Sequence, residues 1–227
     1  MMKKKVTLLG LFVAMCFISC SESEEDQSEY ANWKENNEEY FHAIYEKATT
    51  EQSVADGQWK TFLKWSLDSS SLPDDHIVVK VMNESGRTES PLYTDSVCLH
   101  VKGSLMPTAY HANGYVFLNT YFGEKEEQQV GTPLYMQANG NARGWIPLTS
   151  IDARADAYPI MLDGLATALL HMHVGDRWLI YIPYQLGFGL RNVAELGIPA
   201  YSTLILDVKL MRIYKPGAPK QRFIKKS

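Results

Sequence analysis

The sequence is poor in cysteine, which limits the covalent chemistry open to the fold. Of the three cysteines in 227 residues, Cys16 and Cys20 stand in an apolar stretch near the N-terminus, and Cys98 stands by itself in the body of the chain. A lone cysteine cannot form an intrachain disulfide. Cys98 lies in a strand-like apolar run, and free cysteine is among the most buried residue types. We therefore expect a buried thiol rather than a reactive one.

Two further absences exclude whole classes of function. The chain has no basic excess, because 22 Lys and Arg stand against 26 Asp and Glu, a formal net charge of -4. Nucleic acid requires a basic face, so we expect no nucleic-acid partner. The histidines show no ligand spacing, since His171 and His173 are two residues apart and would not share a helix face. The few glycine-rich spots match no phosphate-binding loop. We expect neither a metal nor a cofactor.

A membrane-spanning run is also missing from the N-terminal region. Residues 6–18 are apolar, but a bilayer crossing needs roughly 20 such residues. Three lysines precede this run, and a basic head with a short apolar stretch is typical of a secretory signal. Phe17-Ile18-Ser19-Cys20 resembles the lipobox at which bacterial lipoproteins are cleaved. The resemblance implies a signal peptide over residues 1–19 and lipidation of Cys20; an ordinary signal peptide with an incidental cysteine is the alternative.

Residues 20–29 would then form a lipidated acidic tether. The stretch from Ser21 to Glu29 has no apolar residue to bury, so we expect it to be disordered. An acidic run after the lipid cysteine resembles the surface-export signals of some Gram-negative lipoproteins, and a plain solvated spacer explains it equally well. The expected location is the bacterial cell envelope, in the outer membrane through the Cys20 lipid, with the periplasmic and surface faces left open.

Residues 30–75 are expected to form a helical extension. From Tyr30 to Thr49, apolar and aromatic residues recur at three- and four-residue spacing, with Asn37 among them, as in an amphipathic helix. We interpret this stripe as a packing face that docks either on the main domain or on a second copy, so self-association stays open. Residues 50–75 are mixed in pattern and are interrupted by Pro73.

From His76 the pattern changes to that of short strands. Leu204, Leu206, Val208 and Leu210 alternate with other residues, the period of a half-buried strand. An α+β fold is predicted, in which a curved antiparallel sheet wraps a short helix. We expect a helix at 159–173, a long, partly ordered excursion at 121–158, a basic tail at 215–227, and strands at 76–82, 95–105, 114–119, 178–183 and 203–214.

Two segments resemble the FKBP family of peptidyl-prolyl cis-trans isomerases. Residues 172–189 carry Met-x-x-Gly at a helix end, Ile-Pro at a strand end and then Leu-Gly-Phe-Gly. Residues 198–213 carry Ile-Pro-x-x-Ser-Thr-Leu followed by an alternating strand. A weaker match covers Val97–Leu105 and Gly114–Phe117. The resemblance implies an FKBP-like domain over residues 76–214.

Prolyl isomerisation makes unusual demands on a site. Amide resonance sets a rotation barrier of about 18–20 kcal/mol, and no nucleophile or acid is required to cross it. An apolar pocket helps because the planar amide is more polar than the twisted one and loses more on desolvation. A backbone N–H aimed at the substrate carbonyl adds orientation. We therefore expect no catalytic acid or base, and a bowl of apolar side chains that binds proline-containing polypeptide segments.

The resemblance places four conserved or conservatively changed residues in that bowl. Phe117 matches a family phenylalanine, and Ile198 matches the residue whose backbone N–H meets the substrate carbonyl. Met161 and Leu162 stand where the family has Val-Ile.

Five other bowl positions depart from the family. Val101, Leu118 and Phe188 stand where it has Tyr, Asp and Tyr. Leu165 replaces the Trp that floors the bowl, and Leu206 replaces a Phe. The bowl stays apolar but loses a carboxylate, two hydroxyls and an indole. One lost neutral hydrogen bond is worth about 0.5–1.5 kcal/mol, so weak activity is compatible with these residues.

Three functions stay open at this stage. One is a membrane-tethered isomerase that assists the folding of exported proteins. A second is a non-catalytic FKBP-like chaperone or peptide-binding lipoprotein that uses the same groove. A third, less favoured by the sequence, is a structural partner in a surface complex with the N-terminal aromatic helix as its interface.

Overall fold

The computed structural model describes residues 29–121, 131–142 and 161–219. The signal peptide, the lipidation site Cys20 and nearly all of the acidic tether expected from the sequence lie outside these ranges. No helix within them has the length and apolar character that crossing a bilayer requires. The elements are α1 (Trp33–Thr49), α2 (Glu51–Ala55), β1 (Trp59–Leu63), η1 (Pro73–Asp75), β2 (His76–Asn83), β3 (Ser96–Ser104), β4 (Val116–Asn119), β5 (Leu134–Gln137), α3 (Asp163–His171), β6 (Arg177–Ile182), η6 (Tyr184–Leu186), η7 (Ala194–Leu196) and β7 (Leu204–Tyr214).

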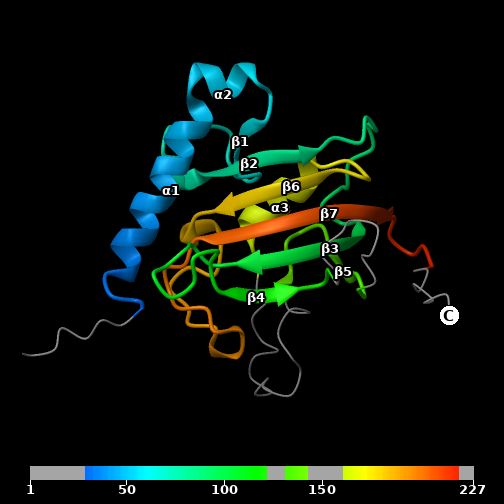
Figure 1. Ribbon diagram of the computed structural model, residues 1–227. Helices are drawn as coiled ribbons and strands as arrows, with labels where there is room; N and C mark the ends of the chain where they lie inside the picture. Colours follow the sequence, from blue (N-terminus) through cyan, green and yellow to red (C-terminus); the bar gives the residue numbers. More distant parts are fainter. Residues whose placement is uncertain (1–28, 122–130, 143–160, 220–227) are drawn as a thin grey trace, which may run out of the picture. The chain divides into compact units, whose positions relative to one another are not determined.

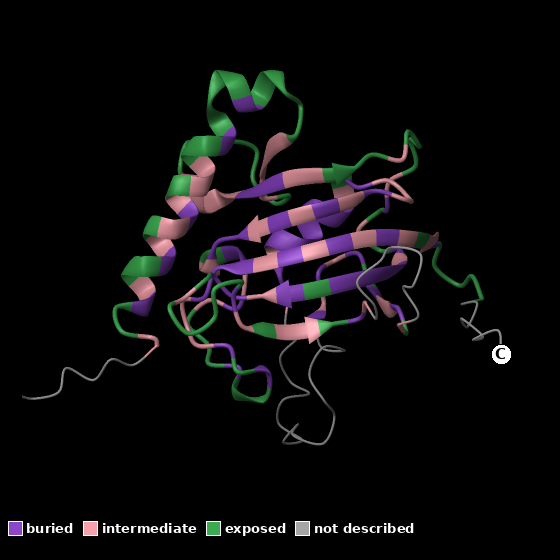
Figure 2. Cartoon of the chain, in the orientation of Figure 1, coloured by how far each residue is buried: buried purple, intermediate pink, exposed green. Residues whose placement is uncertain are grey.

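The described strands form one antiparallel sheet in the order β1-β2-β6-β7-β3-β4, and β5 pairs with β3 beside β4 (Figure 1). The predicted α+β fold is confirmed. The alternation expected in β7 appears directly as burial, because residues 204, 206, 208 and 210 are buried and the residues between them are partly exposed (Figure 2). One face of the sheet is therefore a core face.

The helix α3 covers this core face, which we call the inner face. Gly164 permits a close approach, since a Cβ there would lie 2.4 Å from Cγ2 of Ile182 and 3.1 Å from Cγ2 of Ile77. Leu165 and Leu169 are fully buried between helix and sheet. The helix begins at Asp163, four residues later than the sequence pattern indicates, because Met161 and Leu162 are extended.

The helix α1 packs on the opposite, outer face of the sheet near β1, β2 and β6. Phe41 and Ala48 are buried against Val78, and Tyr181 of β6 packs on the same cluster. The aromatic stripe that the sequence left between two alternatives thus docks on the chain's own domain. The sheet lies between α3 on its inner face and α1 on its outer face.

Two strands lie where the sequence indicated none. Trp59–Leu63 pairs with β2 as an edge strand, so the expected helical extension over residues 30–75 contains part of the main sheet. The four-residue strand Leu134–Gln137 lies within the excursion expected over residues 121–158 and pairs with β3. Cys98 is a free, fully buried thiol in β3, as predicted, and burial raises its pKa.

Candidate functional site

The predicted site positions gather toward one end of the sheet. Ile182 at the end of β6 pairs with Leu204 at the start of β7. Ser104 at the end of β3 pairs with Ile205 of β7. The connection between β6 and β7, residues 183–203, therefore begins and ends at the same edge as the junction of β3 and β4 (Figure 1). We call this edge the site end.

An apolar seat lies on the inner face at the site end and consists of Gly103, Phe117 and Leu206. A Cβ at Gly103 would lie 2.4 Å from Cε2 of Phe117 and 3.2 Å from Cδ2 of Leu206, so the ring packs directly on the glycine. Phe117 has no partner in the β3–β4 register, which shifts at this point. Such a bulge turns a side chain away from the regular pleat. The bulge thus places the Phe117 side chain on the inner face, against Gly103.

Two predicted positions flank the seat. Leu118 pairs with Gly103 across the sheet and is half-buried, as is Phe117. Val101 is fully buried two residues before Gly103 and pairs with Val208. The structure therefore brings Val101, Phe117, Leu118 and Leu206 together on three adjacent strands. Phe117 and Leu118 form the accessible part of this group.

Three more predicted positions lie at the start of α3. Leu162 and Leu165 are fully buried, and Met161 is half-buried. The backbone N–H of Leu162 donates to the carbonyl of Gly140 (2.9 Å), which holds the residues before α3 beside the segment after β5. Met161 is thus the one member of this group that a ligand reaches without displacing core side chains.

The remaining two predicted positions, Phe188 and Ile198, lie in the connection between β6 and β7. Phe188 is 6 % exposed and Ile198 is 1 % exposed. The backbone N–H of Ile198 donates to the carbonyl of Val193 (3.1 Å), and the N–H of Val193 donates back to Ile198 (2.8 Å). The role expected of this N–H, donation to a substrate carbonyl, would require the Val193 carbonyl to be displaced.

Sequence reasoning passed over Tyr115 as a site residue. A Cβ at Gly197 would lie 2.9 Å from the hydroxyl oxygen of Tyr115, so this phenol packs on the turn that precedes Ile198. Tyr115 is half-buried and precedes Phe117 by two residues. Its hydroxyl is therefore a polar group beside the turn that leads into Ile198. The sequence signal that could have identified Tyr115 as a site residue is its position two residues before Phe117.

One ionisable group at the site end, Tyr184, has a shifted pKa. Tyr184 lies in the connection after β6, where burial, followed by its hydrogen bond to Glu38, raises its pKa to about 12. Among the residues that the structure describes, no three His, Cys, Asp or Glu side chains gather closely enough to hold a metal ion. The nine predicted site positions all carry apolar side chains, which offer a ligand desolvation and shape.

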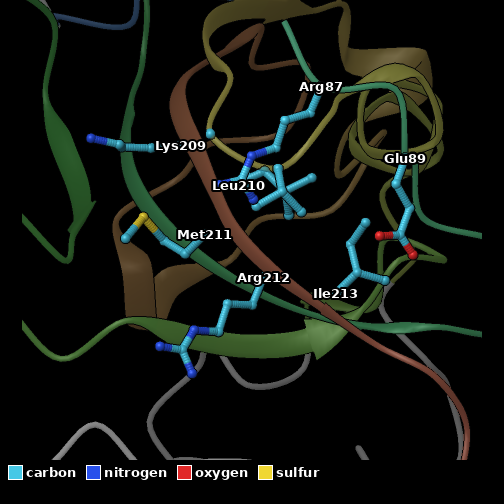
Figure 3. A pocket seen from close by; sticks show the side chains of 9 residues that line it. Arg87, Glu89, Lys209, Leu210, Met211, Arg212 and Ile213 are labelled. Carbon is cyan, nitrogen blue, oxygen red and sulfur yellow. The ribbon is translucent and has the colours of Figure 1, made fainter. Parts of the chain in front are cut away.

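A cavity of about 430 Å³ lies elsewhere, near the opposite end of β7. Figure 3 shows charged side chains around it, and none of the nine predicted site residues contributes to its lining: Arg87, Glu89, Val174, Gly175, Lys209, Leu210, Met211, Arg212 and Ile213. An open, charged depression does not desolvate a peptide bond. The apolar seat, although it is largely filled in this structure, suits that chemistry better.

Comparisons with known proteins bear on the fold and the family of this chain. Residues 151–211 match the family model of FKBP-type peptidyl-prolyl cis-trans isomerases. The macrophage infectivity potentiator of Trypanosoma cruzi is 27% identical over 150 residues, which cover 66% of this chain and 59% of that protein. The FKBP-type 22 kDa peptidyl-prolyl cis-trans isomerase of Escherichia coli (strain K12) is 30% identical over 134 residues, which cover 59% of this chain and 48% of that protein.

A solved structure shows the same fold. The crystal structure of FkpA from Escherichia coli superposes with a TM-score of 0.50 at 24% sequence identity, covering 85% of this chain and 65% of that one. This likeness shows an FKBP-like fold. The chain spans about half to three fifths of the length of the curated relatives that it matches. Taken together, the matches support the FKBP-type family for this chain.

Proposed function

We propose that this chain is a peptidyl-prolyl cis-trans isomerase that holds the proline of a polypeptide segment on the apolar seat. The observation that carries the proposal is the ring of Phe117, packed on Gly103 beside Leu206 and half-open to solvent. The family match over residues 151–211 supports it, because those residues supply α3, β6 and most of β7 around the seat.

The reaction follows from the physical character of this seat. A proline ring on Phe117 and Leu206 replaces water around the Xaa-Pro amide with hydrocarbon. The planar amide has the larger dipole and loses more hydration than the twisted one, so the barrier of about 18–20 kcal/mol falls. Orientation by a rim donor such as the Tyr115 hydroxyl would add to this effect. No covalent intermediate and no proton transfer is needed.

Exchange NMR on short Xaa-Pro peptides tests the activity. We expect the purified full chain to increase the cis-trans exchange rate, and tacrolimus, a ligand of FKBP pockets, to abolish the increase. Phe117→Ala should remove most of the catalysis. Val116→Ala is the matched control, because Val116 is the neighbouring residue of the same strand and is 41% exposed. If Phe117→Ala and wild type increased the cis-trans exchange rate equally, the activity would not come from the apolar seat.

A non-catalytic peptide-binding module is the second candidate. The engaged N–H of Ile198 favours it, since the expected donor to the substrate is already bonded to Val193. The replacement of the family's Asp, Trp and Tyr by Leu118, Leu165 and Phe188 points the same way. A folded protein that binds Xaa-Pro peptides at Phe117 without accelerating exchange would establish this alternative.

The proposal includes attachment to a membrane through Cys20 and action on exported proteins in the bacterial envelope. The basic head, the apolar run and the lipobox-like Phe17-Ile18-Ser19-Cys20 support it. Mass spectrometry of the protein from a membrane fraction should show an N-terminal acylated Cys20. Cys20→Ser should move the protein to the soluble envelope fraction. An unmodified Cys20 in membrane-derived protein would contradict the anchor and leave the isomerase proposal standing.

A further inference from the structure

We propose that α1 is a brace that sets the position of the two loops at the site end, with Asn37 as its positioning residue. These site loops are residues 184–189, which contain Phe188, and residues 198–203, which begin at Ile198. The inference rests on the proposed function, because it concerns how the proline-binding end is held in shape.

Asn37 is a fully buried polar residue in α1. Its Oδ1 accepts a hydrogen bond from the backbone N–H of Thr203 (2.7 Å), and its Nδ2 donates to the carbonyl of Trp33 (2.7 Å). The hydroxyl of Thr203 donates to the carbonyl of Asn37 (3.3 Å). Burying an amide side chain costs free energy unless its polar atoms form hydrogen bonds. These bonds therefore fix the position of Thr203 relative to Asn37.

The same helix holds the turn that follows Ile198. Nε1 of Trp33 donates to Oγ of Ser202 (3.0 Å), which in turn donates to the carbonyl of Pro199 (2.7 Å). Tyr201, between the held residues, has a left-handed φ of 64°. That conformation is uncommon outside glycine and persists where the surroundings impose it.

The second site loop is linked to the first and to α1. The N–H of Tyr201 donates to the carbonyl of Gly189 (2.9 Å), the residue after Phe188. The hydroxyl of Tyr184 donates to Oε1 of Glu38 (3.0 Å), and its ring packs edge-on against Tyr201 at 5.2 Å. Two adjacent helical residues, Asn37 and Glu38, therefore contact both loops.

These polar contacts are separate from those that dock the helix. Phe41 and Ala48 bury an apolar stripe of α1 against Val78, and such burial supplies most of the stability of a helix in a protein. The Asn37 end adds direction, because a hydrogen bond is strong only within a narrow range of distances and angles. The helix should therefore have two separable roles, attachment through Phe41 and Ala48 and loop positioning through Asn37.

Amide hydrogen exchange on the full chain, followed by NMR, distinguishes these roles. The test variant is Asn37→Ala, and Trp33→Phe is a second variant that keeps an aromatic ring but removes the indole donor to Ser202 and part of a buried side chain. Ala48→Gly is the control, since it weakens the same helix without touching a loop contact. In Asn37→Ala we expect the Tyr201 amide to exchange about tenfold faster, the change that 1.4 kcal/mol of lost local stability produces. In Ala48→Gly its exchange should match wild type.

Catalysis on Xaa-Pro peptides is measured on the same samples, under conditions in which every variant is folded. We expect kcat/KM to fall by about 10- to 100-fold in Asn37→Ala, as for a small displacement of positioned groups, and to stay unchanged in Ala48→Gly. Equal exchange and equal kcat/KM in the two variants would overturn the brace. A wild type without catalysis would refute the proposed function, while the exchange comparison would still decide whether α1 positions the loops.

Discussion

Replacing Gly103 by alanine would show whether the ring of Phe117 forms the binding surface. The added Cβ would lie 2.4 Å from Cε2 and 2.5 Å from Cζ of the ring, and 3.2 Å from Cδ2 of Leu206. Carbon atoms rest about 3.5–4.0 Å apart, so the ring must move by about 1 Å. Gly103 is not among the residues with positive φ, so its backbone accepts alanine.

The magnitudes separate an effect on binding from an effect on folding. Alanine gains about 0.5–1 kcal/mol over glycine within a strand, and the forced displacement costs about 1–3 kcal/mol. The free energy of unfolding should therefore fall by at most about 2.5 kcal/mol. A displacement of about 1 Å in a site lowers activity by up to about 100-fold. We expect a folded variant with a large loss of kcat/KM and of tacrolimus affinity.

Urea unfolding, exchange NMR and ligand titration on the same sample would test this reasoning. A double-mutant cycle makes the test specific to the ring. In a Phe117→Ala background the added methyl of Gly103→Ala meets no ring, so it should cause no further loss of affinity. A folded Gly103→Ala protein with wild-type rate and affinity would refute the assignment of the seat. A further loss in the double mutant would show that the methyl acts through another contact.

Three other perturbations have defined outcomes. Burial alone would raise the pKa of Asp176, but hydrogen bonds from the N–H groups of Ser85 and His173 hold that pKa below its ordinary value of 3.8. Its stabilising contribution is therefore complete above about pH 5 and is lost as the pH falls through the lowered pKa. Asp176→Asn should cost about 1.5–3 kcal/mol in urea unfolding at pH 7 and should flatten the acid dependence; an unchanged pH profile would contradict this. Leu165→Trp restores the family's floor residue but enlarges a fully buried side chain. We expect thermal unfolding to show a loss of about 1–3 kcal/mol in stability. An unchanged Tm would show that the core around residue 165 has room for the larger side chain. Glu38→Gln removes the carboxylate that accepts a hydrogen bond from the Tyr184 hydroxyl. Ultraviolet titration should then find the pKa of Tyr184 below about 12. An unchanged pKa of Tyr184 would exclude that hydrogen bond in solution.

The strands differ in how far the sequence predicted them. β7 was predictable because one of its faces is buried and the other is partly exposed, so apolar residues recur at every second position. β1 was not, because every residue in it is half-buried. Trp59 packs with the α1 cluster on the outer face, whereas the ring of Phe62 contacts His171 of α3 on the inner face. A strand that packs on both faces carries no alternation.

The site was predictable in its composition but not in its connections. Phe117 could be located from a local motif, and the structure places it on the seat with Leu206, although its role in binding stays a prediction. The contact between Asn37 and Thr203 joins residues 166 positions apart. The sequence pattern around one of them gives no information about the other, so the contact could not be predicted. The only sequence feature that indicated a specific hydrogen-bond partner was the presence of Asn37 within an apolar stripe. The bond between Ile198 and Val193 depends on the backbone path of a loop, which side-chain patterns do not encode.

The position of β7 at the middle of the sheet has a consequence for the order of folding. β6 pairs with one side of β7 and β3 with the other, so among the described strands the groups β1-β2-β6 and β3-β4-β5 are joined into one sheet by pairing with residues 204–214. A chain emerging from a ribosome delivers these residues after the other described strands, and such non-local pairing is slow. Both halves therefore keep open edges until residues 204–214 have been synthesised. Leu206 arrives with that strand, so the apolar seat is incomplete until then.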